Sequence, residues 1–92
     1  MDNLTIVIPY FNGENYIHNL LSDLPAEIAV VIVDDHSDEP LSLRRANTTI
    51  YRPVQKGYFT GAVNYALART KTDVLVLNQD VRLTGTAWLD LI

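Results

Sequence analysis

The sequence contains no cysteine, so it can form neither a disulfide framework nor a thiolate metal site. Basic residues are also scarce: seven Lys and Arg stand against eleven Asp and Glu, and they do not cluster. This argues against nucleic-acid binding through phosphate neutralisation. At a formal charge of −4, an anionic ligand would need a metal ion or helix N-termini to supply the positive field.

Long apolar runs are absent as well. No stretch approaches the roughly 20 residues that span a bilayer. Residues 1–3 lack the basic and apolar regions of a signal peptide. The sequence therefore predicts a soluble, cytoplasmic protein, and it leaves association with a membrane surface open.

What is present is typical of one small globular domain, here taken as residues 1–92. Hydrophobic residues make up 48% and charged residues 20%. Four β-branched, apolar or aromatic segments predict strands at 4–8, 28–33, 48–52 and 74–77, the third near a sheet edge. The unbroken apolar run at 74–77 predicts a strand buried on both faces. Alternation with helices predicts an α/β fold with a doubly wound, mainly parallel sheet, and right-handed crossovers give the order 3-2-1-4.

Two apolar stripes at helical spacing predict the main helices. The first stripe is followed by Pro25, which stops its helix, and Asn12 is the best candidate cap. The second is expected to end near Arg69 or Lys71. Residues 41–47 predict a short, weak helix, and another helix begins around Trp88 with apolar residues that lack partners. The stripes consist of Tyr16, Ile17, Leu20, Leu21 and Leu24, and of Phe59, Ala62, Val63, Ala66 and Leu67.

Polar residues follow the first, second and fourth strands, where open α/β sheets bind their ligands. Pro9, by lacking an N–H, is expected to end the first strand. The segments 9–12, 34–37 and 78–80 should therefore line one cleft. Asp80 is a hard oxygen donor suited to a divalent cation that also holds phosphate oxygens. The alternative is that Asn78 and Asp80 only shape a turn and cap the next helix.

Several residues of this cleft have two interpretations. Tyr10 and Phe11 either pack as local core or offer a ring on which a flat base stacks. The acidic loop 34–39 is mostly solvated, and at most one of its first two carboxylates need face the cleft, where it could accept a hydrogen bond from a uracil or thymine imide. His36 is expected to be an exposed loop side chain rather than a ligand. Gly57 and Gly61 serve either a turn and tight packing or the close approach of a ligand.

Four segments, in this order and spacing, resemble the N-terminal half of a family 2 glycosyltransferase with the GT-A, Rossmann-like fold. The resemblance covers nearly the whole chain, and each piece alone is weak. Because the family continues beyond such a half, the chain is expected to be truncated. The segments are Ile6-Val7-Ile8-Pro9-Tyr10-Phe11-Asn12-Gly13, Val31-Ile32-Val33-Asp34-Asp35-His36-Ser37, Gly57-Tyr58-Phe59-Thr60-Gly61-Ala62-Val63-Asn64 and Leu75-Val76-Leu77-Asn78-Gln79-Asp80-Val81.

The resemblance implies a site for a nucleotide-diphosphate sugar. In that family the segment at 9–11 borders the base, and the residue matching Asp35 contacts the imide of uracil or thymine. Asp80 matches the last carboxylate of the DxD motif, which binds Mg²⁺ or Mn²⁺ across the diphosphate. Asn78 departs from the usual first aspartate, as in members resembling rhamnosyltransferases, which favours a dTDP-rhamnose-like donor. The expected donor-site residues are Pro9, Tyr10, Phe11, Asn12, Asp35, Gly57, Asn78 and Gln79, with Asp80 at the metal.

The same resemblance implies transfer with inversion to an acceptor hydroxyl, which needs a carboxylate base. In the family that base and the pocket for a saccharide or lipid-linked acceptor lie beyond the point where this chain ends, so no catalytic residue is expected among residues 1–92. The alternatives are a non-catalytic, truncated nucleotide-binding or oligomerising module and another nucleotide-binding α/β protein such as a nucleotidyltransferase. The last is disfavoured because no glycine-rich, basic phosphate loop follows the first strand.

Overall fold

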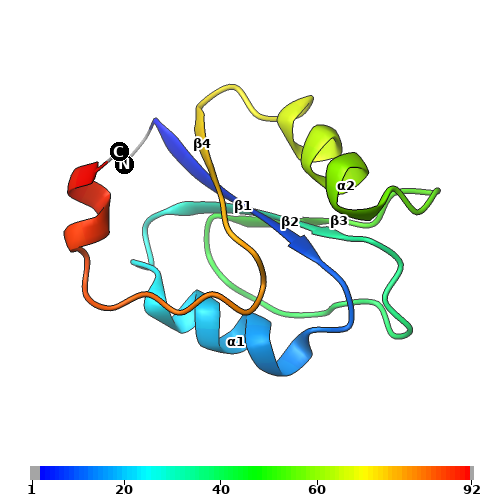
Figure 1. Cartoon of the computed structure of the whole chain (residues 1–92), viewed down its shortest axis with the longest axis horizontal. Helices are drawn as coiled ribbons and strands as arrows, with labels where there is room; N and C mark the ends of the chain where they lie inside the picture. Colours follow the sequence, from blue (N-terminus) through cyan, green and yellow to red (C-terminus); the bar gives the residue numbers. More distant parts are fainter. Residues whose placement is uncertain (1–2, 92) are drawn as a thin grey trace.

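The computed structural model describes residues 3–91 as a four-stranded parallel sheet with a helix on each face (Figure 1). All three strand pairings are parallel, and the order is β3-β2-β1-β4. The predicted α/β fold class and strand order are therefore confirmed. The elements are β1 (Leu4–Tyr10), α1 (Glu14–Asp23), β2 (Ala29–Asp34), β3 (Thr48–Tyr51), α2 (Tyr58–Leu67), β4 (Asp73–Val76) and the 3₁₀-helix η1 (Ala87–Leu91).

The two faces of the sheet carry separate cores because successive side chains of a strand point to opposite faces. On β1, Ile6 and Ile8 pack on the α1 side with Ile17 and Leu20, and all four are fully buried. Val7 points the other way and packs with α2. A central strand covered on both faces explains why β1 has a continuous apolar sequence rather than an alternating one.

The fourth strand is less buried than its sequence predicted. The apolar residues 74–77 are only partly buried, although they match the same pattern as β1 and β2. The reason is position: within residues 3–91, β4 is an edge strand that pairs with β1 alone. Its register runs from Leu4↔Asp73 to Val7↔Val76, and it leaves the sheet before β1 does.

The prediction that Pro9 ends the first strand was wrong, because β1 continues to Tyr10. In a central strand of a parallel sheet, the N–H and C=O of one residue face one neighbouring strand, and those of the next residue face the other. The Val7 carbonyl accepts a bond from Leu77 on the β4 side, whereas the Tyr10 carbonyl accepts one from Asp35 on the β2 side. The nitrogen of Pro9 therefore faces β4, which has already ended. A missing N–H costs no ladder bond there.

The helices differ from prediction in the N-cap of α1 and in the width of their buried faces. Gly13, not Asn12, is the N-cap of α1, and it makes no side-chain cap bond. Tyr16 was assigned to the buried stripe but is 55% exposed, since it turns toward the strand ends instead of the sheet. On α2 only Ala62 and Ala66 are buried, so the predicted stripe is too wide.

Residues 41–45 form no helix, contrary to the prediction for 41–47. One side chain from outside the segment bonds its first N–H, and the Arg45 side chain bonds outward. The Leu41 N–H donates to Asp34, and the Arg45 guanidinium donates to the carbonyls of Pro25 and Ile28. These tertiary bonds replace the local bonds that a weak helix would need.

The last described segment is a 3₁₀-helix rather than the start of an α-helix. Trp88 and Leu89 pack against the core on the α1 side, so the expectation that they lack partners was wrong. The side chain of Leu91 and all of Ile92 lie outside the described residues. Among the helices that the structure describes, none has the length and apolar character to cross a membrane.

Candidate functional site

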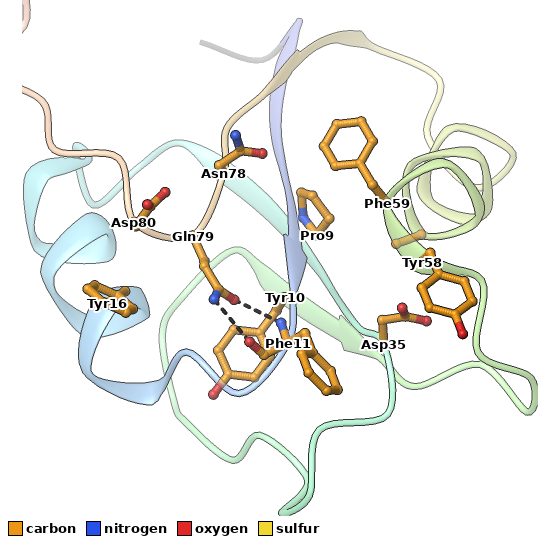
Figure 2. A pocket seen from close by; sticks show the side chains of 11 residues that line it. Pro9, Tyr10, Phe11, Tyr16, Asp35, Tyr58, Phe59, Asn78, Gln79 and Asp80 are labelled. Carbon is orange, nitrogen blue, oxygen red and sulfur yellow. Dashed lines mark hydrogen bonds between the residues drawn. The ribbon is translucent and has the colours of Figure 1, made fainter.

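A cleft of about 390 Å³ opens at the carboxyl ends of β1, β2 and β4 (Figure 2). Its walls come from the end of β1, the start of α1, the residue after β2, the N-terminal half of α2 and the segment after β4. The predicted convergence of three polar strand ends is therefore what the structure shows. The lining residues are Pro9, Tyr10, Phe11, Tyr16, Asp35, Tyr58, Phe59, Ala62, Asn78, Gln79 and Asp80.

The neighbouring carboxylates Asp34 and Asp35 face different surroundings. Asp34 is 1% exposed and accepts bonds from the N–H groups of Ser37 and Leu41 and from Arg52 Nη1, the last at 3.0 Å. Burial alone would raise the pKa of Asp34, but these donors outweigh it and hold the pKa below its ordinary value. Asp34 therefore organises the loop after β2, and only Asp35 lines the cleft.

Asp35 is also nearly buried, at 6% exposed. Its Oδ1 accepts the Gly57 N–H at 2.8 Å, at the start of α2, and its Oδ2 lies 3.1 Å from Lys56 Nζ. Burial acts to raise the pKa of Asp35, but the Gly57 N–H and Lys56 together outweigh burial and hold the pKa below its ordinary value. The carboxyl is therefore ionised at neutral pH. Each carboxylate oxygen has two acceptor positions and accepts one of these two donors, so each retains a position for a donor from the cleft.

The two aromatic residues at the end of β1, Tyr10 and Phe11, have different surroundings. Tyr10 is 3% exposed and belongs to the core, and burial, followed by the charge of Asp34, raises the pKa of its phenol. Phe11 is 43% exposed and presents its ring in the cleft. Lys56 Nζ lies 3.8 Å from the centre of that ring, within the range of a cation–π contact.

The Gln79 side chain joins two walls of the cleft. Its Oε1 accepts the Phe11 N–H at 2.8 Å, and its Nε2 donates to the Phe11 carbonyl at 3.0 Å (Figure 2). The turn after β4 is thereby tied to the turn after β1.

Asp80 and Asn78 are exposed and point into the same cleft from the segment after β4. The ion pairs within residues 3–91 involve other carboxylates, so the Asp80 charge is available to a ligand. No cluster of three His, Asp or Glu side chains that could hold a cation occurs in that range. One carboxylate and one amide oxygen fit a cation such as Mg²⁺, which keeps several waters and takes further ligands from substrate phosphates.

The structure places seven of the nine predicted site residues on the cleft wall: Pro9, Tyr10, Phe11, Asp35, Asn78, Gln79 and Asp80. Asn12 and Gly57 do not line it and instead bond to residues of the loop after β2. Asn12 has a φ of 48°, which asparagine tolerates, and its Oδ1 accepts the Asp38 N–H at 2.8 Å. Gly57 contributes its N–H to Asp35, and its φ of −117° shows no left-handed turn.

Four lining residues were not predicted as site residues: Tyr16, Tyr58, Phe59 and Ala62. Tyr58 is 70% exposed, at the first turn of α2. Both Tyr16 and Phe59 were counted as helix core from their spacing. The available signal was their position in the first turn of a helix, where a side chain can face the strand ends instead of the sheet.

His36 is not the exposed side chain that the sequence predicted. It is partly buried, has a φ of 65°, and its Nε2 lies 2.6 Å from the carbonyl oxygen of Pro53. It thus helps to hold the loop after β3 beside the loop after β2, and it does not line the cleft.

Comparison with known proteins identifies the family. Two solved structures of TarS from S. aureus share the fold at 23% identity, with TM-scores of 0.76 (residues 1–349) and 0.73. Both alignments cover 97% of this chain, which spans 31% and 18% of those chains. No curated protein matches. The model of the family described as Glycosyl transferase family 2 matches residues 5–90. The chain therefore belongs to glycosyl transferase family 2.

Proposed function

We propose that this chain forms the donor site of a glycosyltransferase and binds a nucleotide-diphosphate sugar whose base is uracil or thymine. The observation that carries the proposal is the placement of Asp35 and Asp80 on different walls of one cleft, with the Phe11 ring also exposed in it (Figure 2). Asp35 is suited to contact a nucleobase, and Asp80 is suited to bind a cation that also holds the diphosphate. Family membership supports the same assignment.

The base side of the site consists of Phe11 and Asp35. A flat pyrimidine can stack on the exposed Phe11 ring, which stabilises binding by an amount on the order of 1–3 kcal/mol. Asp35 is ionised and retains acceptor capacity, so it can accept the imide N–H of uracil or thymine. Cytosine has no such N–H and would leave this buried carboxylate without the added donor.

The diphosphate side consists of Asp80 and Asn78, which would hold Mg²⁺ or Mn²⁺ together with the phosphate oxygens. The formal charge of −4 favours such a cation, because the net charge of the protein repels a diphosphate. When bound, the cation acts as a Lewis acid and stabilises the departing nucleotide diphosphate. Asp80 would contribute the anionic ligand to this cation, and Asn78 would contribute a neutral oxygen ligand.

The finer assignment extends the same proposal. The Asn78-Gln79-Asp80 sequence, which resembles that of rhamnosyltransferases, supports a dTDP-rhamnose-like donor. Transfer would occur with inversion to a saccharide or lipid-linked acceptor, as in polysaccharide biosynthesis. The base that deprotonates the acceptor is expected outside this chain, which spans less than a third of each TarS chain.

Calorimetric titration with UDP, dTDP and CDP in the presence of Mn²⁺ tests the base assignment. We expect UDP and dTDP to bind at least about tenfold more tightly than CDP, because a buried acceptor discriminates strongly against a ligand that lacks its donor. Asp35→Asn should shrink that preference. Equal binding of UDP and CDP, or no binding of any nucleotide to the folded chain, would overturn the proposal.

A further inference from the structure

The pair of hydrogen bonds between Gln79 and Phe11 has the pattern of a strand pairing, although one partner is a side chain. The Phe11 N–H donates to Gln79 Oε1 at 2.8 Å, and Gln79 Nε2 donates to the Phe11 carbonyl at 3.0 Å. The last β1–β4 register pair is Val7↔Val76, and the Leu77 N–H still donates to Val7. The amide of Gln79 thus continues the β1–β4 connection beyond the point where the two backbones diverge.

Gly13 is adapted to this side chain. A Cβ at residue 13 would overlap the carboxamide of Gln79. The φ of Gly13 is −116°, outside the left-handed range that favours glycine. The Gln79 amide lies directly against its α-carbon and leaves no room for a Cβ.

The two segments that Gln79 joins contain the two halves of the proposed site. Phe11 is on the turn at residues 10–13, at the base side. Asn78 and Asp80 flank Gln79 on the turn at residues 78–80, at the diphosphate side. A nucleoside diphosphate must reach both turns, and a fixed spacing between them removes an ordering cost from binding.

We propose that Gln79 is a positioning residue that fixes the spacing between the base side and the diphosphate side of the donor site. The inference rests on the proposed function and deepens it. It assigns Gln79 to the protein's own backbone rather than to the ligand, because its Oε1 and one Nε2 hydrogen are already bonded to Phe11. Its effect is therefore largest for ligands that contact both turns.

The test compares two nucleotides in two variants. Gln79→Met keeps the length of the side chain and removes both hydrogen bonds, and Gln55→Met makes the same change on an exposed loop residue that does not line the cleft. UDP with Mn²⁺ spans both turns, whereas UMP without metal reaches mainly the base side. We expect Gln79→Met to weaken UDP–Mn²⁺ about tenfold, UMP less than about twofold, and Gln55→Met neither.

Equal losses for UDP–Mn²⁺ and UMP in Gln79→Met would overturn the positioning role, since a contact with the nucleoside or general loosening would act on both. Unchanged binding of both would overturn it as well. Failure of the folded wild-type chain to bind UDP would instead refute the proposed function, and the inference with it. The two failures are thus distinguishable.

A second measurement needs no nucleotide. Gly13→Ala should lower the midpoint of thermal unfolding by about 5 °C or more, because the added methyl displaces the Gln79 amide. The same substitution in a Gln79→Ala background should cost far less, since the overlapping atoms are gone. Equal costs in the two backgrounds would show that Gln79 does not occupy the space beside Gly13, and would contradict the proposal.

Discussion

Lys56 and Asp35 form an ion pair beside the cleft, with Nζ 3.1 Å from Oδ2 and 2.9 Å from the Asp35 carbonyl oxygen. The same ammonium group lies over the Phe11 ring. The Lys56 ammonium therefore contacts both residues assigned to the nucleobase, Phe11 and Asp35. Lys56 lies on the loop between β3 and α2, whose sequence carries no ligand motif beyond Gly57.

Lys56→Met should make nucleotide binding more sensitive to acid. Burial already acts to raise the pKa of Asp35, and Lys56 is one of the groups that lower it. Without Lys56 the pKa of Asp35 rises, so the carboxylate that accepts the imide is lost at a higher pH. The measurement is the ratio of UDP affinities at about pH 7 and about pH 5.

Lys71→Met, which removes an exposed lysine away from the cleft, is the matched control. Titration of UDP itself affects every variant equally and cancels in the comparison. The same pH dependence in Lys56→Met and Lys71→Met would contradict the role of Lys56.

Asp34→Asn should destabilise the fold by about 2–3 kcal/mol, because it removes the charge of a buried acceptor that serves two backbone N–H groups and Arg52. Urea unfolding measures the free energy of unfolding. Asp38→Asn, on an exposed neighbour, should change it by less than about 0.5 kcal/mol. Similar values for both would mean that the Asp34 network is not a main support of the loop.

The ion pair between Asp23 and Arg82 should make the stability of the fold depend on pH under acidic conditions. Arg82 Nε lies 2.7 Å from Asp23 Oδ2, which also accepts the Leu83 N–H. Hydrogen bonding from Arg82 and then Leu83 lowers the pKa of Asp23 from 3.8 to about 2. The stabilisation is thus fully present above about pH 4 and is lost as the pH falls toward about 2, where the folded protein must bind the proton.

Asp23→Asn and Arg82→Met should each flatten this part of the stability profile, measured as the thermal midpoint against pH. The double variant should add little to either single one, because both remove the same interaction. Additive effects would show that the two side chains act independently.

The sheet was predictable because its signals are local and strong. Ile6–Ile8 and Val30–Val33 are continuous apolar runs, and the right-handed crossover rule then fixes the order of the strands. The burial of β4 was not predictable from the same kind of run. Its sequence resembles a central strand, but its exposure depends on having only one neighbour among the described strands.

The site was predictable where the residue type and strand end coincide, as at Asp35 and Asp80. It was not predictable where two segments distant in sequence meet. Gln79 and Phe11 are 68 residues apart in the sequence, and no local pattern indicates the contact of Gln79 with Phe11 and Gly13. Tyr16 shows a related limit: its helical spacing matches the core, and only its place in the first turn of α1 directs it to the cleft.

The measurement that tests the central claim most directly is calorimetric titration of UDP and dTDP into the wild-type chain, Asp80→Ala and Asp90→Ala, each with and without Mn²⁺. Asp90 is an exposed carboxylate outside the cleft and serves as the control. We expect Mn²⁺ to tighten nucleotide binding at least about tenfold in the wild type and in Asp90→Ala, and to have no such effect in Asp80→Ala, which should remain folded. The same Mn²⁺ enhancement in Asp80→Ala would contradict the assignment of Asp80 to a metal-bridged diphosphate.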